Sequence, residues 1–306
     1  MQFQGLHVIA AAAIICGWAG LAAAKPNDRY LEEHNQAHSV VDKLLDQAKK
    51  GDPKAQYKLG SMYLTGLGVT RNDTEAARWF SVAAEQDYVE AEVNLGVMYY
   101  MGKGLPRNFG AAAKWFRKGA LHGDPQAEVN LGLMYYKGQG VARDYDEALR
   151  LFRLSAGKGY SAAAYNIGLM YYNGEGVTRS YAEAARWYGQ AAASGNANAE
   201  YNLGVMYFKG QGMARDTVAG LKWIRQAAQK GFPPAQSNLG EMYADGRGVP
   251  QDDIKAYAWL SAAVDFGYEP AGDAKETLRA RMTSQQIVAA QALKDRCTKV
   301  HFADCD

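Results

Sequence analysis

A repeat of 36 residues constrains the fold of this chain more than any other feature. A Leu-Gly or Ile-Gly pair recurs at this constant spacing, and a Met-Tyr pair begins two residues after its glycine in every copy. The Leu or Ile stands at positions 59, 95, 131, 167, 203 and 239. Repeats of this length are typical of a solenoid, in which each unit buries its apolar face only against its neighbours.

Each unit predicts two helices joined by a tight turn. Ala91, Leu95 and Met98 have the spacing of one helix face, and a Gly-x-Gly pair then ends that first helix. Three residues after the next apolar residue stands an Asn, Asp or Ser, the residue types preferred as the N-cap of a helix. These N-caps are Asn72, Asn108, Asp144, Ser180, Asp216 and Asp252. Asn72, Asp144 and Ser180 have a Glu three residues later, which predicts a capping box.

A glycine also lies inside the first helix of every unit, at positions 60, 96, 132, 168, 204 and 240. Glycine in a helix interior costs about 1 kcal/mol relative to Ala. Its presence in all six units predicts that another helix approaches the backbone closely there.

The pattern predicts an all-α chain of six helix-turn-helix repeats over residues 51–266, with a helical cap at each end. Residues 25–50 form a polar-faced N-terminal cap. Residues 267–306 form C-terminal capping helices and a tail, where Thr283 and Gln286 make a capping box. Cys297 and Cys305 are expected to pair in an oxidising compartment, with two free thiols as the alternative.

Residues 1–24 carry no Lys, Arg, Asp or Glu, and they end in Ala22-Ala23-Ala24 before Lys25. This apolar run predicts an export signal cleaved after Ala24, and hence a periplasmic or secreted protein without a membrane span. An uncleaved membrane anchor is the alternative, since the run is near the length that crosses a bilayer. The formal charge of +2 from 34 basic and 32 acidic residues disfavours nucleic acid as a partner.

The unit resembles the Sel-one-like repeat (SLR), a subclass of the tetratricopeptide-like α/α solenoids. The resemblance covers residues 51–266 and is carried in one unit by Ala127, Asn130, Leu131, Gly132, Met134, Tyr135, Gly138, Gly140, Val141, Asp144, Ala148, Phe152 and Ala156. It implies a right-handed superhelix whose concave groove binds a protein or peptide, often in an exported bacterial adaptor or scaffold of envelope signalling, regulation or host interaction. It implies no common enzymatic activity and no cofactor.

Three sets of recurring residues are candidates for binding. Asparagines in the first helices, with Lys58 in the first unit, could hold the main chain of a peptide or instead bond the backbone of the next unit. These are Asn94, Asn130, Asn166, Asn202 and Asn238, and Tyr100, Tyr136 and Tyr172 are the candidate tyrosines. Arginines before the N-caps could bind anions or pair with an acid of a neighbouring unit. These are Arg71, Arg107, Arg143, Arg179 and Arg215.

Catalytic and metal-binding patterns are weak. Ser155 and Lys158 have the spacing of penicillin-recognising enzymes, but neither Ser-Asp-Asn nor Lys-Thr-Gly occurs in the chain. A cysteine-rich SLR branch implies an alternative function, a hydrolase of β-lactams or peptidoglycan fragments, yet no unit here contains a cysteine. His34 and His38 could share a helix face, but no third metal ligand follows from the spacing. We therefore expect an exported, non-enzymatic scaffold that binds a protein or peptide partner.

Overall fold

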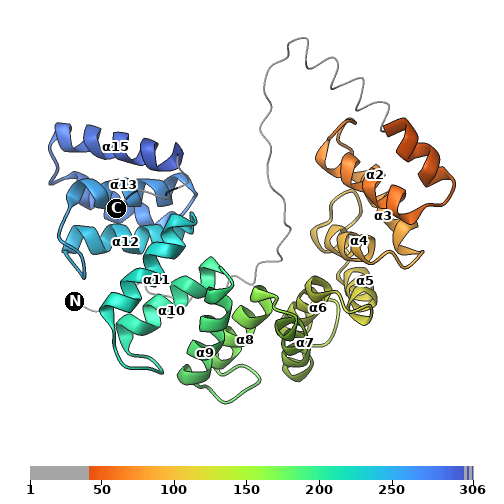
Figure 1. Cartoon of the computed structure of the whole chain (residues 1–306), viewed down its shortest axis with the longest axis horizontal. Helices are drawn as coiled ribbons and strands as arrows, with labels where there is room; N and C mark the ends of the chain where they lie inside the picture. Colours follow the sequence, from red (N-terminus) through yellow and green to blue (C-terminus); the bar gives the residue numbers. More distant parts are fainter. Residues whose placement is uncertain (1–40, 300–301, 303–304, 306) are drawn as a thin grey trace, which may run out of the picture. The chain divides into compact units, whose positions relative to one another are not determined.

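The computed structural model describes residues 41–299, 302 and 305, and every regular element among them is an α-helix. Of these residues, 41–160 form one compact unit, and 161–299 with 302 and 305 form a second. Within each unit, consecutive helices pack against one another as antiparallel pairs (Figure 1). The predicted all-α solenoid of six repeats is thus confirmed.

The first unit begins with a helix over 41–49. Three helix pairs follow: α2 (Pro53–Thr65) and α3 (Asp73–Ala84), α4 (Val89–Met101) and α5 (Phe109–Leu121), and α6 (Pro125–Lys137) and α7 (Tyr145–Gly157). Ala48 is 3% exposed and packs with Leu59 and Trp79 of the first pair. The helix over 41–49 therefore covers the outer face of the first repeat.

The second unit contains three further pairs and two additional helices. The pairs are α8 (Ser161–Asn173) and α9 (Tyr181–Ala193), α10 (Ala197–Lys209) and α11 (Thr217–Gln229), and α12 (Pro233–Asp245) and α13 (Asp253–Asp265). The additional helices α14 (Pro270–Arg279) and α15 (Ser284–Lys299) both pack on α13.

The predicted N-caps begin the second helix of every repeat. Each of the six side chains accepts a hydrogen bond from a backbone N–H of the first turn, as Asp144 does from Glu147. The second hydrogen bond of the predicted capping box, from the N-cap backbone N–H to the Glu side chain, does not form at Asp144. The N–H of Asp144 donates to the carbonyl of Tyr135, and the Glu147 carboxylate pairs with Arg150 instead. The capping box of α15 is complete, since Thr283 and Gln286 bond each other in both directions.

The glycine inside each first helix makes room for a side chain of the partner helix. A Cβ added at Gly96 would lie 2.6 Å from the ring of Phe116. Gly60, Gly132 and Gly168 meet the ring of the equivalent residue in the same way, and Gly204 and Gly240 meet an Ile and a Leu. The predicted close approach is confirmed, and it is made chiefly by a side chain of the same repeat.

The C-terminal tail is joined to α15. Cys297 and Cys305 form a disulfide across 8 residues. Between them, Phe302 is 5% exposed, and its ring stacks on Trp259 of α13 with centroids 5.5 Å apart. The tail thus covers the open face of the last repeat.

Some predicted features lie outside the described residues: the export signal over 1–24, most of the N-terminal cap, and His34 and His38. Within residues 41–299, no helix combines the length and the apolar composition that crossing a membrane requires.

Candidate functional site

The predicted asparagine row lies on the first helices, but its middle members are not open to solvent. Asn130, Asn166 and Asn202 are 1%, 5% and 1% exposed. Asn94 and Asn238 are partly exposed, and Lys58 is exposed. The buried three do not form the surface row that the sequence predicts, because a peptide main chain has no access to their amides.

Three of the asparagines contact a tyrosine or their own helix. Asn94 Nδ2 lies 3.4 Å from the hydroxyl of Tyr57 in the preceding repeat. Asn238 is hydrogen-bonded in the same way to Tyr201, whose pKa is raised to about 12 because burial disfavours the charged phenolate. Asn166 Nδ2 instead donates to the carbonyl of Ala162 in its own helix, at 2.9 Å. The link between repeats is therefore made by a tyrosine hydroxyl, whereas the sequence suggested a backbone group.

The candidate tyrosines are half-buried. The ring of Tyr100 packs against Phe109 at 5.1 Å, and its hydroxyl donates to Gln139 Oε1 in the next repeat at 2.8 Å. Tyr172 repeats both contacts, with Tyr181 at 5.1 Å and with Gln211 at 3.3 Å. The ring of Tyr136 packs on Tyr145 at 5.5 Å. These contacts occupy the tyrosines in holding helices together.

The arginines before the N-caps are all exposed. Arg107, Arg143 and Arg179 each place the guanidinium over the aromatic ring two residues later, at 5.5, 5.8 and 5.6 Å from the centroid. Arg71 pairs instead with Asp73, at 3.1 Å. Each arginine therefore rests on its own repeat, and the alternative of an acid in a neighbouring unit does not describe these four.

We use the term seam for the contact between the Gly-x-Gly turn of one repeat and the start of the second helix of the preceding repeat. At Gly104, Gly140 and Gly212, an added Cβ would overlap the backbone of that helix start. The hydroxyls of Tyr100 and Tyr172 cross the same seam to reach the turn. In these repeats the seam is closed.

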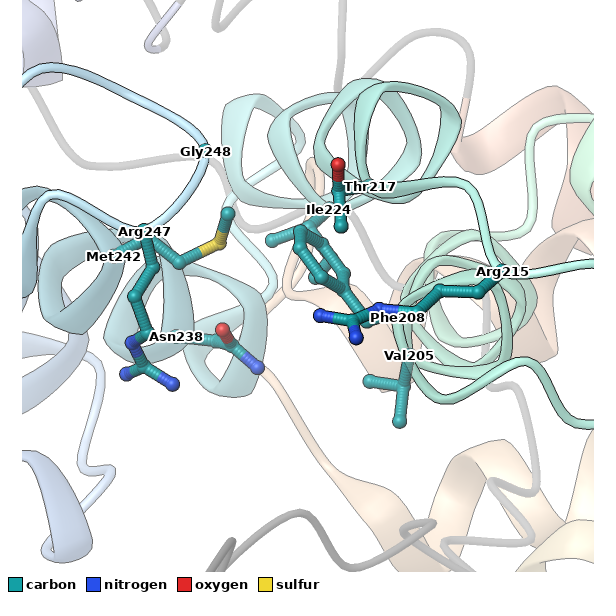
Figure 2. Close-up of a pocket in the computed structure, with 9 residues that line it drawn as sticks. All are labelled: Val205, Phe208, Arg215, Thr217, Ile224, Asn238, Met242, Arg247 and Gly248. Atoms are coloured by element: carbon teal, nitrogen blue, oxygen red, sulfur yellow. The ribbon is translucent and has the colours of Figure 1, made fainter. Parts of the chain in front are cut away.

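The seam between the fifth and sixth repeats is open. A Cβ at Gly248 would meet only Met242 Cε, at 3.7 Å. A cavity of about 210 Å³ lies here between α10, α11, α12 and the turn that follows α12. We call this cavity the seam pocket (Figure 2). Its lining residues are Val205, Phe208, Arg215, Thr217, Ile224, Asn238, Met242, Arg247 and Gly248.

Changes in the repeat sequence account for the opening. Phe208 stands where other repeats have Tyr100 or Tyr172, so it has no hydroxyl to reach the next turn. Its ring lies where a Cβ of Gly220 would be, at 2.6 Å, and other repeats have Ala at the Gly220 position. Thr217 stands where the second, third and fourth repeats have an aromatic residue and the first has Asp73. Ile224 stands where all four preceding repeats have an aromatic residue. Together these changes remove the hydroxyl link that Tyr100 and Tyr172 make across their seams, and they reduce the side-chain volume at this seam.

Polar groups surround an apolar interior. Val205, Ile224 and Met242 are at most 2% exposed and form the floor. Figure 2 shows Arg215 and Arg247 coming from opposite sides of this floor. Arg247 pairs with Asp245, at 3.0 Å, whereas no acid among the described residues pairs with Arg215.

The seam pocket brings together one member of the predicted asparagine set, Asn238, and one of the predicted arginine set, Arg215. Its volume is below the roughly 300 to 1,000 Å³ of pockets that hold drug-sized ligands. The site therefore suits one apolar side chain of a partner with a carboxylate beside it. Sequence reasoning could have located it from the coincidence of Phe208, Thr217 and Gly220 in one repeat.

The Ser155 and Lys158 pair is engaged elsewhere. Ser155 is fully buried, and its hydroxyl donates to the carbonyl of Pro125 at 2.8 Å. Lys158 Nζ donates to the Gly123 carbonyl and to Glu128 Oε1, at 2.7 and 2.6 Å. This arrangement offers neither an accessible nucleophile nor a base directed at it.

Comparisons with known proteins agree with the geometry. The family model described as the Sel1 repeat matches residues 53–88, 89–124, 125–160, 161–196, 197–232 and 233–266. No curated protein matches the chain at a significant level.

Two solved structures are similar in both sequence and fold. One is c5321, a protective antigen present in uropathogenic Escherichia coli strains that displays an SLR fold, with 34% identity and a TM-score of 0.70. That match covers 87% of this chain and 57% of c5321, so this chain spans little more than half of that protein. The other is a Sel1 repeat protein from Oxalobacter formigenes, with 31% identity, a TM-score of 0.70, and coverage of 76% and 94%.

Proposed function

Because the chain belongs to the Sel1 repeat family, we propose that it is an exported interaction scaffold that binds a protein or peptide through the seam pocket. Sel1 repeat proteins generally mediate protein–protein interaction and are generally non-enzymatic. The finer assignment, a bacterial envelope adaptor without catalytic activity, is our inference. The observation that carries the choice of site is the open seam at Gly248, in contrast to the closed seams at Gly104, Gly140 and Gly212.

The partner presents an apolar side chain next to a carboxylate. The apolar group enters between Val205, Ile224 and Met242, which exclude water from it. The carboxylate meets the exposed guanidinium of Arg215, and the amide of Asn238, which also lines the pocket, bonds the partner's main chain. Insertion of one apolar anchor into a desolvated pocket is the arrangement typical of interface hot spots.

Binding is tested on the mature chain, residues 25–306, with a displayed library of random peptides. We expect the selected peptides to share an apolar residue adjacent to Asp, Glu or a free C-terminus. Arg215→Ala weakens their binding, while Arg143→Ala, the same change at the equivalent position of another repeat, does not. Equal losses for the two arginines would contradict the proposed site.

Export is tested separately. Fractionation and N-terminal sequencing of the native protein should find a chain that starts at Lys25 outside the cytoplasm. A chain that keeps residues 1–24 and stays with the membrane would support the anchored alternative.

A further inference from the structure

A carboxylate buried at the start of a first helix recurs in three repeats. Glu92, Glu128 and Glu200 are 0%, 3% and 3% exposed. In the third and fifth repeats, a lysine thirty residues later pairs with it, as Lys158 does with Glu128 and Lys230 with Glu200. The same ammonium groups also donate to the carbonyls of Gly123 and Gly195, which end the preceding repeat. A single cation thus joins two repeats.

The contact between the first and second repeats differs from this arrangement at two positions. His122 stands where Lys158 and Lys230 stand in the other two. Asp87 stands where every other repeat has glycine, and its φ of 60° lies in the left-handed region that favours glycine. Both changes place metal-binding residue types beside Glu92. Asp87 does so although its backbone conformation favours glycine.

The three side chains converge. His122 Nδ1 lies 3.0 Å from Glu92 Oε2, and one ligand atom each from Asp87, Glu92 and His122 all lie within 4.8 Å of one another. Glu92 is fully buried, and its Oε1 accepts no hydrogen bond, although the Lys118 ammonium lies 3.4 Å away. Glu128 and Glu200 also leave one oxygen without a hydrogen bond, but neither has a histidine beside it.

We propose that Asp87, Glu92 and His122 bind a divalent transition metal ion, with Zn²⁺ the best match. One imidazole and two carboxylates are ligands that Zn²⁺ accepts, at bond lengths of about 2.0 to 2.2 Å. A fourth position faces solvent, because the Asp87 and His122 side chains are 64% and 38% exposed. A water molecule or a partner side chain can fill it.

Lys118 competes for the same place. Its Nζ lies 2.6 Å from Asp87 Oδ1 and 3.4 Å from Glu92 Oε1. The ammonium is therefore the cation of this cluster when no metal is bound. The Lys118 side chain is 35% exposed, so it can turn to solvent when an ion enters. The ion then takes over the role that Lys158 has in the next repeat.

Zinc titration of the mature chain by calorimetry tests the proposal, with Co²⁺ absorption as a report on coordination. His122→Lys restores the residue of the sister repeats, so it should remove one equivalent of bound Zn²⁺ while leaving the metal-free melting temperature unchanged or higher. Asp87→Gly should weaken zinc binding and raise the metal-free melting temperature, because it relieves the left-handed Asp. Lys118→Gln should strengthen zinc binding, because the competing ammonium is gone.

The result that overturns the proposal is equal zinc stoichiometry and affinity in the wild type, His122→Lys and Asp87→Gly. In that case Lys118 is the permanent cation of the cluster, and any bound zinc sits at another place. Because both variants copy residues that sister repeats already hold, a loss of zinc with an intact helical melt cannot be ascribed to misfolding.

Discussion

Lys158 Nζ lies 2.6 Å from Glu128 Oε1, thirty residues earlier in the same repeat. The first repeat joins the same two positions with a neutral pair, since Gln86 Nε2 donates to Gln56 Oε1 at 2.7 Å. Where Glu128 is 3% exposed, Lys158 keeps a side chain that is 40% exposed. Removing Lys158 would therefore leave a buried charge without a partner, whereas removing Glu128 would leave a charge that water can still solvate.

Removing the lysine should be more costly than removing the charge pair. Lys158→Met leaves a buried carboxylate unpaired, and we expect a loss of about 3 to 5 kcal/mol in unfolding free energy. The double change E128Q/K158Q copies the Gln56 and Gln86 pair and should cost much less. Urea unfolding measures both. Arg150→Met, which breaks an exposed pair with Glu147, is the control and should cost about 1 kcal/mol or less. Equal losses for Lys158→Met and Arg150→Met would show that the buried pair does not hold the repeats.

The glycines inside helices should respond in opposite directions to alanine. Gly96→Ala forces a methyl group against the fully buried Phe116, so we expect a loss of about 1 to 3 kcal/mol. Gly189 in α9 has no neighbour within 4 Å of an added Cβ, and Gly189→Ala should stabilise by about 0.5 to 1 kcal/mol. Thermal and urea unfolding of the two variants compare the signs. A gain for Gly96→Ala would contradict the close packing.

Alkaline pH should weaken the second unit through Tyr201. Burial raises the pKa of Tyr201 to about 12, above the usual value near 10. A group whose pKa is raised on folding stabilises the folded state fully below its unfolded pKa, and this contribution is lost as pH rises from about 10 to about 12. When the pH rises from 8 to 11, the unfolding free energy of Tyr201→Phe should therefore fall by about 1 kcal/mol less than that of the wild type.

Unfolding at the two pH values, with phenolate absorbance as a second readout, checks the Tyr201 prediction. Tyr207→Phe, a change at a partly exposed tyrosine of the same helix, is the control. Identical pH profiles for wild type and Tyr201→Phe would contradict the assigned cause.

The disulfide should hold the tail and leave the repeats unaffected. Closing a loop of 8 residues contributes about 2 to 3 kcal/mol in the chain-entropy view. In C297S/C305S, Phe302 should leave Trp259, and hydrogen exchange should rise in α15. Exchange in α10, α11 and α12 should stay as in the wild type. A uniform rise in all these helices would show that the tail stabilises the whole second unit.

Local features of the fold could be read from the sequence because they depend on neighbouring residues. An N-cap such as Asp144 bonds within its own turn, and Gly96 signals a close contact within its own repeat. Burial of Asn130 depends on how closely successive repeats approach, which the repeat pattern does not specify. This is why an amide expected at the surface lies inside.

The seam pocket and the metal cluster were harder to predict for a related reason. Each arises from departures such as Phe208 or His122, whose effect depends on residues of an adjacent repeat. Such departures are visible in an aligned set of repeats. Their structural effect can be read only from the three-dimensional structure, which places Phe208 over Gly220 and His122 beside Glu92.

The central claim is that the open seam between the fifth and sixth repeats is the binding site. The double change F208Y/R247Q installs the pair that closes the seam between Tyr172 and Gln211, and it leaves the floor residues in place. The most direct test is the affinity of a selected peptide for this variant, measured by fluorescence anisotropy beside the wild type. We predict that binding falls at least about tenfold, which corresponds to a loss of about 1.4 kcal/mol, while the melting temperature is kept or raised. Unchanged affinity in a folded F208Y/R247Q protein would contradict the claim.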